Sequence, residues 1–175
     1  LFAIWAPKIY QYYALSRVLL EVWRKMVWNF PGTKSVWAAC ALNFSRACTK
    51  RHRDFGNLAV GWCSITALGN FNPDLGGHLI LWDLKLVIRF PPGATILIPS
   101  ALIEHSNVSI QQGEVRHSFT QYTAGGLFRW ISQDYMTKET FLATASEERK
   151  ARYQEEQATR WERGMQMFSM IDDLQ

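Results

Sequence analysis

The stretch Arg51-His52-Arg53-Asp54-Phe55-Gly56-Asn57 decides the fold of this 175-residue chain. On a β-strand, residues i and i+2 point to the same face, so His52 and Asp54 can reach one metal ion together. His105 follows downstream as a candidate third ligand, and three such ligands leave other coordination positions open. The early His-x-Asp pair and the late histidine must then meet in space, which limits how the strands between them can fold.

Two histidines and one carboxylate form the facial triad that holds Fe(II) in non-haem oxygenases. Arg116 follows the late histidine and suits the far carboxylate of 2-oxoglutarate, because a guanidinium binds a carboxylate through a bidentate fork. The order along the chain favours this interpretation. The alternative is that His52 and Asp54 form a surface ion pair on a strand, with His105 a hydrogen-bonded loop residue.

The composition indicates one globular domain. Hydrophobic residues make up 48% of the chain and charged residues 19%, which argues against disorder. The net charge of +4 permits an acidic partner such as nucleic acid but does not require one. The three cysteines form no CxxC motif, so they predict reduced thiols and an intracellular chain. No uncharged run has the composition of a membrane span, so no membrane partner is expected.

Residues 35–131 show the period of β-strands. Strands are predicted at Ser35–Leu42, Arg46–Asp54, Trp62–Leu68, Trp82–Phe90, Ala94–Ile98, Val108–Ile110 and Val115–Tyr122. Short strands separated by Gly, Pro and Asn turns favour a sandwich or barrel. Among these, the double-stranded β-helix, a jelly-roll and cupin-like architecture, brings an early His-x-Asp pair and a late histidine together. The predicted fold is therefore mainly β, with this core.

Helices are predicted on both sides of the core. In Pro7–Trp28, one apolar face is expected to pack against a sheet; it comprises Leu15, Val18, Leu19, Val22 and Met26. The charged stretch Thr137–Leu174 carries an apolar stripe that faces either the core or a partner, made of Ala158, Trp161, Met165 and Phe168. The predicted organisation is a single domain with an N-terminal helical support (1–34), a dioxygenase core (35–131) and a C-terminal charged helix (132–175).

Strand alternation defines a candidate pocket. In the last predicted strand, Arg116, Ser118, Thr120 and Tyr122 share one face, and the apolar Val115 and Phe119 lie on the other. One interpretation is a pocket in which Arg116 and Ser118 hold 2-oxoglutarate and Tyr122 faces the substrate. The alternative is a strand face turned to solvent.

Three further features have two interpretations each. His78 contacts the co-substrate or is a polar surface residue. Asn57 meets a base edge or caps the turn. Four cations within eight residues track phosphates or form a solvated face; they are Arg46, Lys50, Arg51 and Arg53.

These motifs resemble the TET/JBP family of Fe(II)/2-oxoglutarate dioxygenases, which oxidise 5-methylpyrimidines in nucleic acid. The resemblance rests on HRDFGN at 52–57, on His105 and on RHSFTQY at 116–122. Two further blocks, 76–84 and 90–100, resemble the group of related proteins found in mushroom-forming fungi, many of them associated with transposable elements. One departure is Ala124, which stands where the animal enzymes place a base-contacting histidine. The chain also lacks their cysteine-rich zinc region.

The resemblance implies a site and a reaction. His52, Asp54 and His105 would bind iron, and Arg116 and Ser118, with His78 as a weaker candidate, would bind 2-oxoglutarate. Asn57 and Tyr122 would face the base. The implied function is oxidation of 5-methylcytosine or a related methylated base in DNA, flipped or single-stranded, in the nucleus. The alternatives are the same chemistry on RNA, protein or a small molecule, and an inactive transposon-derived copy.

Overall fold

The computed structural model describes residues 1–24, 28, 30–32 and 34–174. It divides the chain into two compact units. One unit is Trp37–Thr123, and the other comprises Leu1–Val36 and Ala124–Gln175. The three segments predicted from sequence have different limits from these units, and that division stays a prediction.

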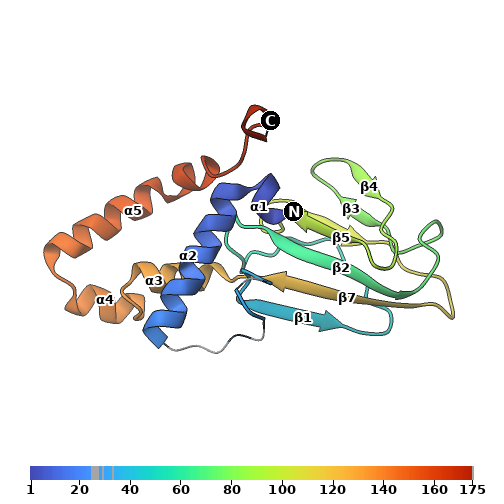
Figure 1. The fold of residues 1–175 in the computed structure, drawn as a ribbon, viewed down its shortest axis with the longest axis horizontal. Coiled ribbons are helices and arrows are strands. Elements are labelled where there is room, and N and C mark those ends of the chain that lie inside the picture. The colour runs from blue at the N-terminus through green and yellow to red at the C-terminus, as the bar shows by residue number, and fades with distance from the viewer. Residues whose placement is uncertain (25–27, 29, 33, 175) are drawn as a thin grey trace. The chain divides into compact units, whose positions relative to one another are not determined.

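Two antiparallel sheets build the unit Trp37–Thr123 (Figure 1). The four-stranded sheet has the order β1 (Ala39–Asn43), β7 (Val115–Tyr122), β2 (Cys63–Asn70) and β5 (Thr95–Ile98). The three-stranded sheet has the order β4 (Leu86–Ile88), β3 (Leu79–Leu81) and β6 (His105–Asn107). The predicted mainly β fold with a double-stranded β-helix core and flanking helices is confirmed.

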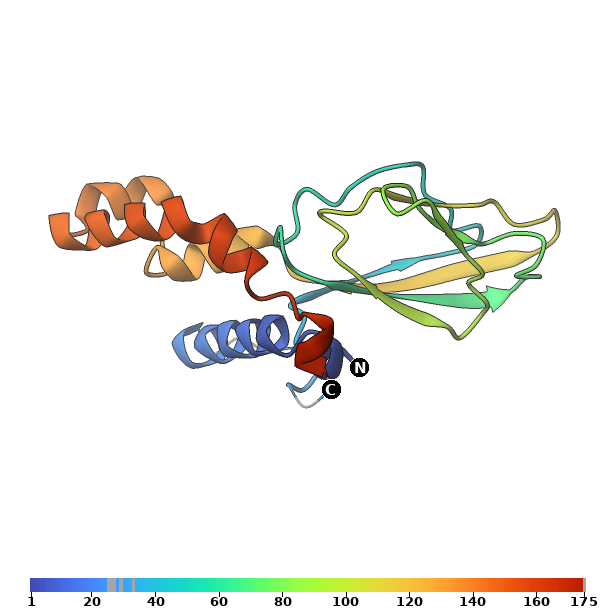
Figure 2. The same cartoon turned by 90° about the horizontal axis from the view of Figure 1, so that it is seen from above.

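The hydrophobic core of this unit lies between the sheets, which form two layers when seen from above (Figure 2). Cys63 and Ala67 of β2 and Ile98 of β5 belong to the same buried cluster as Leu79 and Leu81 of β3. Burial of these side chains from both sheets stabilises the two-layer arrangement, because apolar area is removed from water on both faces.

The predicted strand Trp82–Phe90 is wrong. β3 ends at Leu81, a turn follows in which Lys85 has a φ of 55°, and β4 covers only Leu86–Ile88. The alternation of apolar and polar residues there does not mark a buried face, since Trp82 and Leu84 are exposed. A left-handed residue inside the run reverses the chain, and the period-2 pattern gives no sign of it.

The predicted strand Arg46–Asp54 is also wrong. This segment forms no regular strand, and its ladder contacts are isolated bridges, from Arg46 to Arg116 and from His52 to His105. The strand predicted at Val108–Ile110 does not form there; the nearest strand, β6, covers His105–Asn107, three residues earlier. β7 has the predicted bounds, and β5 and β2 differ from prediction by one or two residues at their ends.

Helices make up the second unit. They are α1 (Phe2–Trp5), α2 (Pro7–Arg24), α3 (Gly125–Ser132), α4 (Lys138–Thr144), α5 (Glu147–Met165) and the 3₁₀ helix η1 (Ile171–Leu174). α3 overlaps the end of residues 35–131, for which the sequence predicts strands. None of the helices among the described residues is long and apolar enough to cross a bilayer.

The apolar face predicted for the first long helix is not its buried face. α2 buries Ile9, Tyr13 and Leu20, whereas the predicted Leu15, Val18, Leu19 and Val22 are exposed. Met26 of the predicted face lies outside the described residues. α2 packs on α3 through aromatic rings, with Tyr12 stacked on Phe128 at 4.9 Å between centroids. Trp161 and Met165 of the C-terminal stripe are also exposed, so the expectation that they face the core is wrong.

Gly69 is a position where the fold requires glycine. Its φ is +114°, and an added Cβ would lie 2.3 Å from the backbone oxygen of Val115. We expect Gly69→Ala to lower the free energy of unfolding by about 2 to 5 kcal/mol, from backbone strain and from the clash. Gly93→Ala is the matched control, since its φ of +84° is also positive but nothing lies within 4 Å. It should cost about 1 to 2 kcal/mol. Equal losses in denaturant titrations would contradict the close approach of β2 to β7.

Candidate metal centre

His52, Asp54 and His105 meet at one point in the structure. Their candidate ligand atoms all lie within 4.8 Å of one another. His52 Nε2 is 3.5 Å from Asp54 Oδ1, and the two imidazole centroids are 4.3 Å apart. Two backbone hydrogen bonds join the segments, from His52 N to His105 O at 3.0 Å and from His105 N to His52 O at 2.9 Å. This bridge sets the two histidines on one face.

Both histidines have their Nδ1 atoms against backbone carbonyls. His52 Nδ1 lies 2.7 Å from Lys50 O, and His105 Nδ1 lies 2.9 Å from Ile103 O. A carbonyl only accepts, so Nδ1 carries the hydrogen and the lone pair of each neutral ring is on Nε2. This arrangement is typical of metal-binding histidines. Burial lowers the pKa of His105, which favours the neutral form that a metal requires.

A hydrogen-bonded chain orients the Asp54 carboxylate. Asn57 Nδ2 donates to Asp54 Oδ2 at 3.4 Å and to Ser100 Oγ at 3.1 Å. The backbone N of Asp54 donates to Ser100 O at 3.0 Å. Ser100 is 1% exposed, so it is a fixed anchor. The side-chain amide of Asn57 therefore helps to orient the Asp54 carboxylate.

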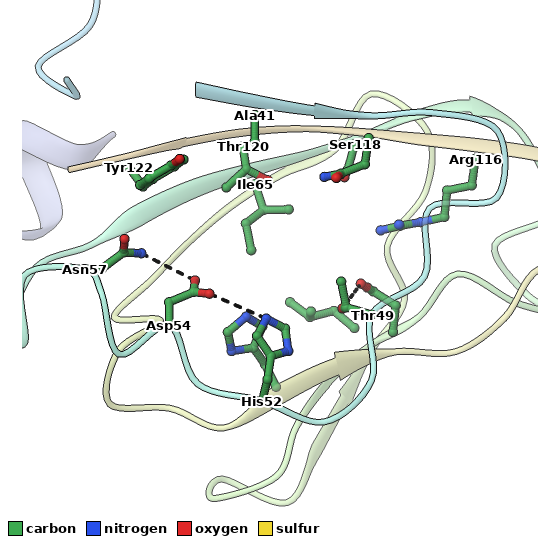
Figure 3. A pocket seen from close by; sticks show the side chains of 14 residues that line it. Ala41, Thr49, His52, Asp54, Asn57, Ile65, Arg116, Ser118, Thr120 and Tyr122 are labelled. Carbon is green, nitrogen blue, oxygen red and sulfur yellow. Dashed lines mark hydrogen bonds and ion pairs between the residues drawn. The ribbon is translucent and has the colours of Figure 1, made fainter. Parts of the chain in front are cut away.

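The three candidate ligands open on a cavity of about 210 Å³. That volume is below the roughly 300 to 1,000 Å³ of drug-sized ligand sites, so it suits a small molecule. Figure 3 shows Arg116 and Ser118 at one end and Asn57 and Tyr122 at the other, with His52 and Asp54 across from Ile65 and Thr120 between them. The face of β7 that carries Arg116, Ser118, Thr120 and Tyr122 therefore lines the cavity.

Arg116 is a buried cation whose hydrogen-bonding capacity is mostly unused. It is 1% exposed, and Nη1 donates to Ala47 O at 2.6 Å. Nε and Nη2 are buried without a partner among the described residues. Burial lowers the pKa of this guanidinium, although an arginine remains charged at neutral pH. Because an unpaired buried charge is costly, this end of the cavity suits an anion.

Further polar groups surround the Arg116 end. Asn107 Nδ2 is buried with no partner in the described structure, while its Oδ1 accepts from Thr49 Oγ1 at 3.0 Å. Ser118 Oγ accepts from Asn43 Nδ2 at 2.9 Å, so the serine hydroxyl hydrogen can be donated to a ligand. These donors add to the anion-binding character of the site.

Sequence reasoning missed four of these polar residues: Asn43, Thr49, Ser100 and Asn107. Asn107 could have been predicted from the sequence, because it follows His105 by two residues and so shares its strand face. Asn43 could not, since it reaches Ser118 through the register of β1 on β7. His78 is not among the residues that line the cavity; it is half-buried immediately before β3. Its role toward the co-substrate stays a prediction.

The fold and the site define a double-stranded β-helix domain with a candidate two-histidine, one-carboxylate metal centre. No model of a known protein family matches the chain, and no curated protein matches it. Twelve chains among solved structures match. One is NgTET1 in complex with 5mC DNA, with 22% identity and a TM-score of 0.46. The match covers 52% of this chain and 35% of that chain, so this chain spans about a third of its length.

A divalent metal should stabilise the folded protein. Mn(II) or Co(II) binds the native state, so at one hundred times its Kd it should raise the free energy of unfolding by about 2.7 kcal/mol. Asp54→Ala should abolish the rise, which thermal unfolding with and without metal would measure. Asp74→Ala is the control, because that carboxylate pairs with Arg89 outside the site. Wild-type protein that shows no metal-dependent rise would refute the centre.

Proposed function

We propose that this protein is an Fe(II)/2-oxoglutarate-dependent dioxygenase acting on 5-methylcytosine, or a related methylated base, in DNA. One observation carries the proposal. The His52–Asp54–His105 cluster opens on a small cavity whose far end holds a buried arginine with two unpaired nitrogens. A metal and a carboxylate in the same cavity are what a keto-acid-dependent oxygenase requires.

The residues present fit iron and the keto acid. Two imidazole nitrogens and one carboxylate oxygen, with other positions open, are the donor set of non-haem Fe(II) oxygenases. His52, Asp54 and His105 would hold the metal, and Arg116 and Ser118 would hold the distal carboxylate of 2-oxoglutarate. When bound, the iron and the keto acid supply the oxidation of a C–H bond by O₂.

This chain's own residues supply position and protection. The two carbonyls that accept from the histidine Nδ1 atoms keep Nε2 aimed at the metal position. Arg116, reaching in from β7, would fix one end of the keto acid so that its other end meets the metal. The apolar lining from Ile65 and Leu79 limits water at the centre.

The opposite end of the cavity suits a substrate with a planar ring. Tyr122 and Asn57 line that end, and both match the motifs that resemble the TET/JBP family. A base inside a duplex cannot reach such a cavity, so the base would be flipped out or single-stranded. Tyr122 would then stack on the base. With this substrate, a nuclear location is part of the proposal.

A second candidate keeps the chemistry and changes the substrate to RNA, protein or a small molecule. One observation favours it. Ala124 stands where the animal enzymes have a base-contacting histidine. This departure bears on the identity of the substrate rather than on the metal or the keto acid.

Replacement of Arg116 by lysine separates keto-acid binding from metal binding. Lysine keeps the charge but loses the bidentate fork, so we expect Arg116→Lys to weaken 2-oxoglutarate binding by about ten- to a hundredfold. Metal affinity should stay close to that of the wild type. Calorimetric titrations of the keto acid and of Mn(II) measure the two. Arg89→Lys, in a surface ion pair, is the control. If Arg116→Lys weakens the binding of 2-oxoglutarate and of Mn(II) to the same extent, Arg116 has a structural role instead.

The substrate is tested by conversion of 2-oxoglutarate to succinate with methylated and unmethylated oligonucleotides. We expect methylated DNA to stimulate turnover. Because a base–aromatic stack contributes about 1–3 kcal/mol, Tyr122→Ala should reduce base oxidation by about 5- to 150-fold. Tyr122→Phe keeps the ring and should retain most of the activity. Turnover that methylated DNA never stimulates would favour the second candidate, and absence of any succinate would reject the dioxygenase.

A further inference from the structure

The residues beside the candidate ligands point away from the cavity. His52, Asp54 and His105 line the cavity, whereas their chain neighbours Arg51, Arg53 and Glu104 are not among its lining residues. β6, which carries His105, pairs with β3, but the segment of His52 and Asp54 joins β6 through an isolated bridge rather than a full ladder. Side-chain contacts outside the cavity add to this bridge.

Arg53 forms the more extensive of the outer contacts. Its Nη2 donates to Asp83 Oδ1 at 2.9 Å and Oδ2 at 3.1 Å, and its Nε donates to Leu102 O at 3.0 Å. Asp83 lies in the turn between β3 and β4, within the range Trp82–Phe90 for which the sequence predicts one strand. The same carboxylate accepts from the backbone N of Glu104 at 2.7 Å. Asp83 thus links the segment of Asp54 to the segment of His105.

Arg51 forms a second outer contact. Its Nη2 donates to Glu104 Oε2 at 2.6 Å, and its guanidinium lies 4.6 Å from the ring centroid of Trp82. Glu104 is also within 3.9 Å of Arg53 Nη2. We call Arg51, Arg53, Asp83 and Glu104 the outer clamp. It joins both sides of the ligand set through ion pairs and through hydrogen bonds to the backbone of Leu102 and Glu104.

The outer clamp gives two members of the cationic cluster a structural contact. Arg51 and Arg53 contact carboxylates of the chain, and Arg46 donates to the carbonyls of Ile110 and Gln111. Arg46 and Arg51 are nevertheless exposed, so the two interpretations of the cluster, phosphate contacts or a solvated face, stay predictions.

We propose that the outer clamp consists of positioning residues for the metal centre, which fix the His52–Asp54 segment against the His105 segment. The proposal rests on the metal centre of the proposed function, and not on its substrate. Half-exposed ion pairs contribute little to global stability. Their effect is therefore expected in the preorganisation of the ligands. Groups that hydrogen-bond a metal ligand change metal affinity by about 10- to 100-fold, and we expect the same order from the outer clamp, which holds the backbone that carries the ligands.

The test measures Co(II) affinity and the visible absorption spectrum of bound Co(II), which reports coordination geometry. The variants are Arg53→Met, which keeps the length of the side chain, and Asp83→Asn, which keeps an oxygen for Glu104 N. Each should weaken Co(II) binding by about 10- to 100-fold and change the spectrum. The double variant should lose no more affinity than Arg53→Met alone, because Arg53→Met already removes the ion pair that Asp83→Asn weakens. Arg53→Lys should recover part of the affinity.

Two further variants complete the design. Arg89→Met breaks a surface ion pair of the same kind away from the site and should leave Co(II) binding unchanged. Arg51→Met weakens the second contact and should reduce affinity in the same direction, which keeps the proposal testable if Arg53→Met fails to fold. The unfolding midpoints of the metal-free variants should stay close to that of the wild type.

Three results would overturn the proposal. In the first, Arg53→Met and Arg51→Met bind Co(II) with wild-type affinity and spectrum. In the second, their losses follow the fall in metal-free stability and Arg89→Met shows the same loss, which assigns a structural role only. In the third, the wild type binds no Co(II), which removes the metal centre itself. Absence of 2-oxoglutarate turnover with normal Co(II) binding rejects the proposed function and leaves the outer clamp standing.

Discussion

The paired backbone hydrogen bonds between His52 and His105 are the contact on which the rest of the site depends. They join a segment without regular strand structure to the start of β6, and they put both imidazoles on the side of the cavity. Asp54, two residues after His52, lies beside it, with Oδ1 3.5 Å from His52 Nε2. Side-chain contacts then add orientation, from Ser100 and Asn57 on the inner side and from the outer clamp on the other.

The second constraint is the buried charge of Arg116. Removing a guanidinium from water without a counter-ion is unfavourable, and the described structure gives two of its nitrogens no partner. A fold retains such a group where a ligand compensates it. The candidate ligand cluster and the cation line one cavity, so one small ligand can contact both, as the proposed function requires. The keto acid of the proposed function satisfies both, because it offers a carboxylate to Arg116 and further oxygens to a metal.

Local patterns in the sequence predicted part of the fold and of the candidate site, but they did not predict the tertiary contacts. The bounds of β7 and the polar face of Arg116 and Ser118 follow from period-2 alternation. The His-x-Asp spacing predicted only that His52 and Asp54 lie together, and the approach of His105 comes from the backbone bridge. The strand expected at Trp82–Phe90 failed because a left-handed residue, Lys85, turns the chain. That turn places Asp83 beside Arg53, a contact between residues far apart in sequence. The contacts of Arg51 and Arg53 and the pairing of Asn43 with Ser118 depend on the topology of the fold. A short stretch of sequence carries no information about that topology.

The central claim is that His52, Asp54 and His105 bind one metal ion. An anomalous difference map from crystals grown with Mn(II) tests it most directly, since it locates the metal without assumptions about activity. The account predicts a single strong peak at bonding distance from Nε2 of both histidines and from an oxygen of Asp54, on the side of the cavity that faces Arg116. A peak bound elsewhere, or no peak among these three side chains at saturating Mn(II), would contradict it.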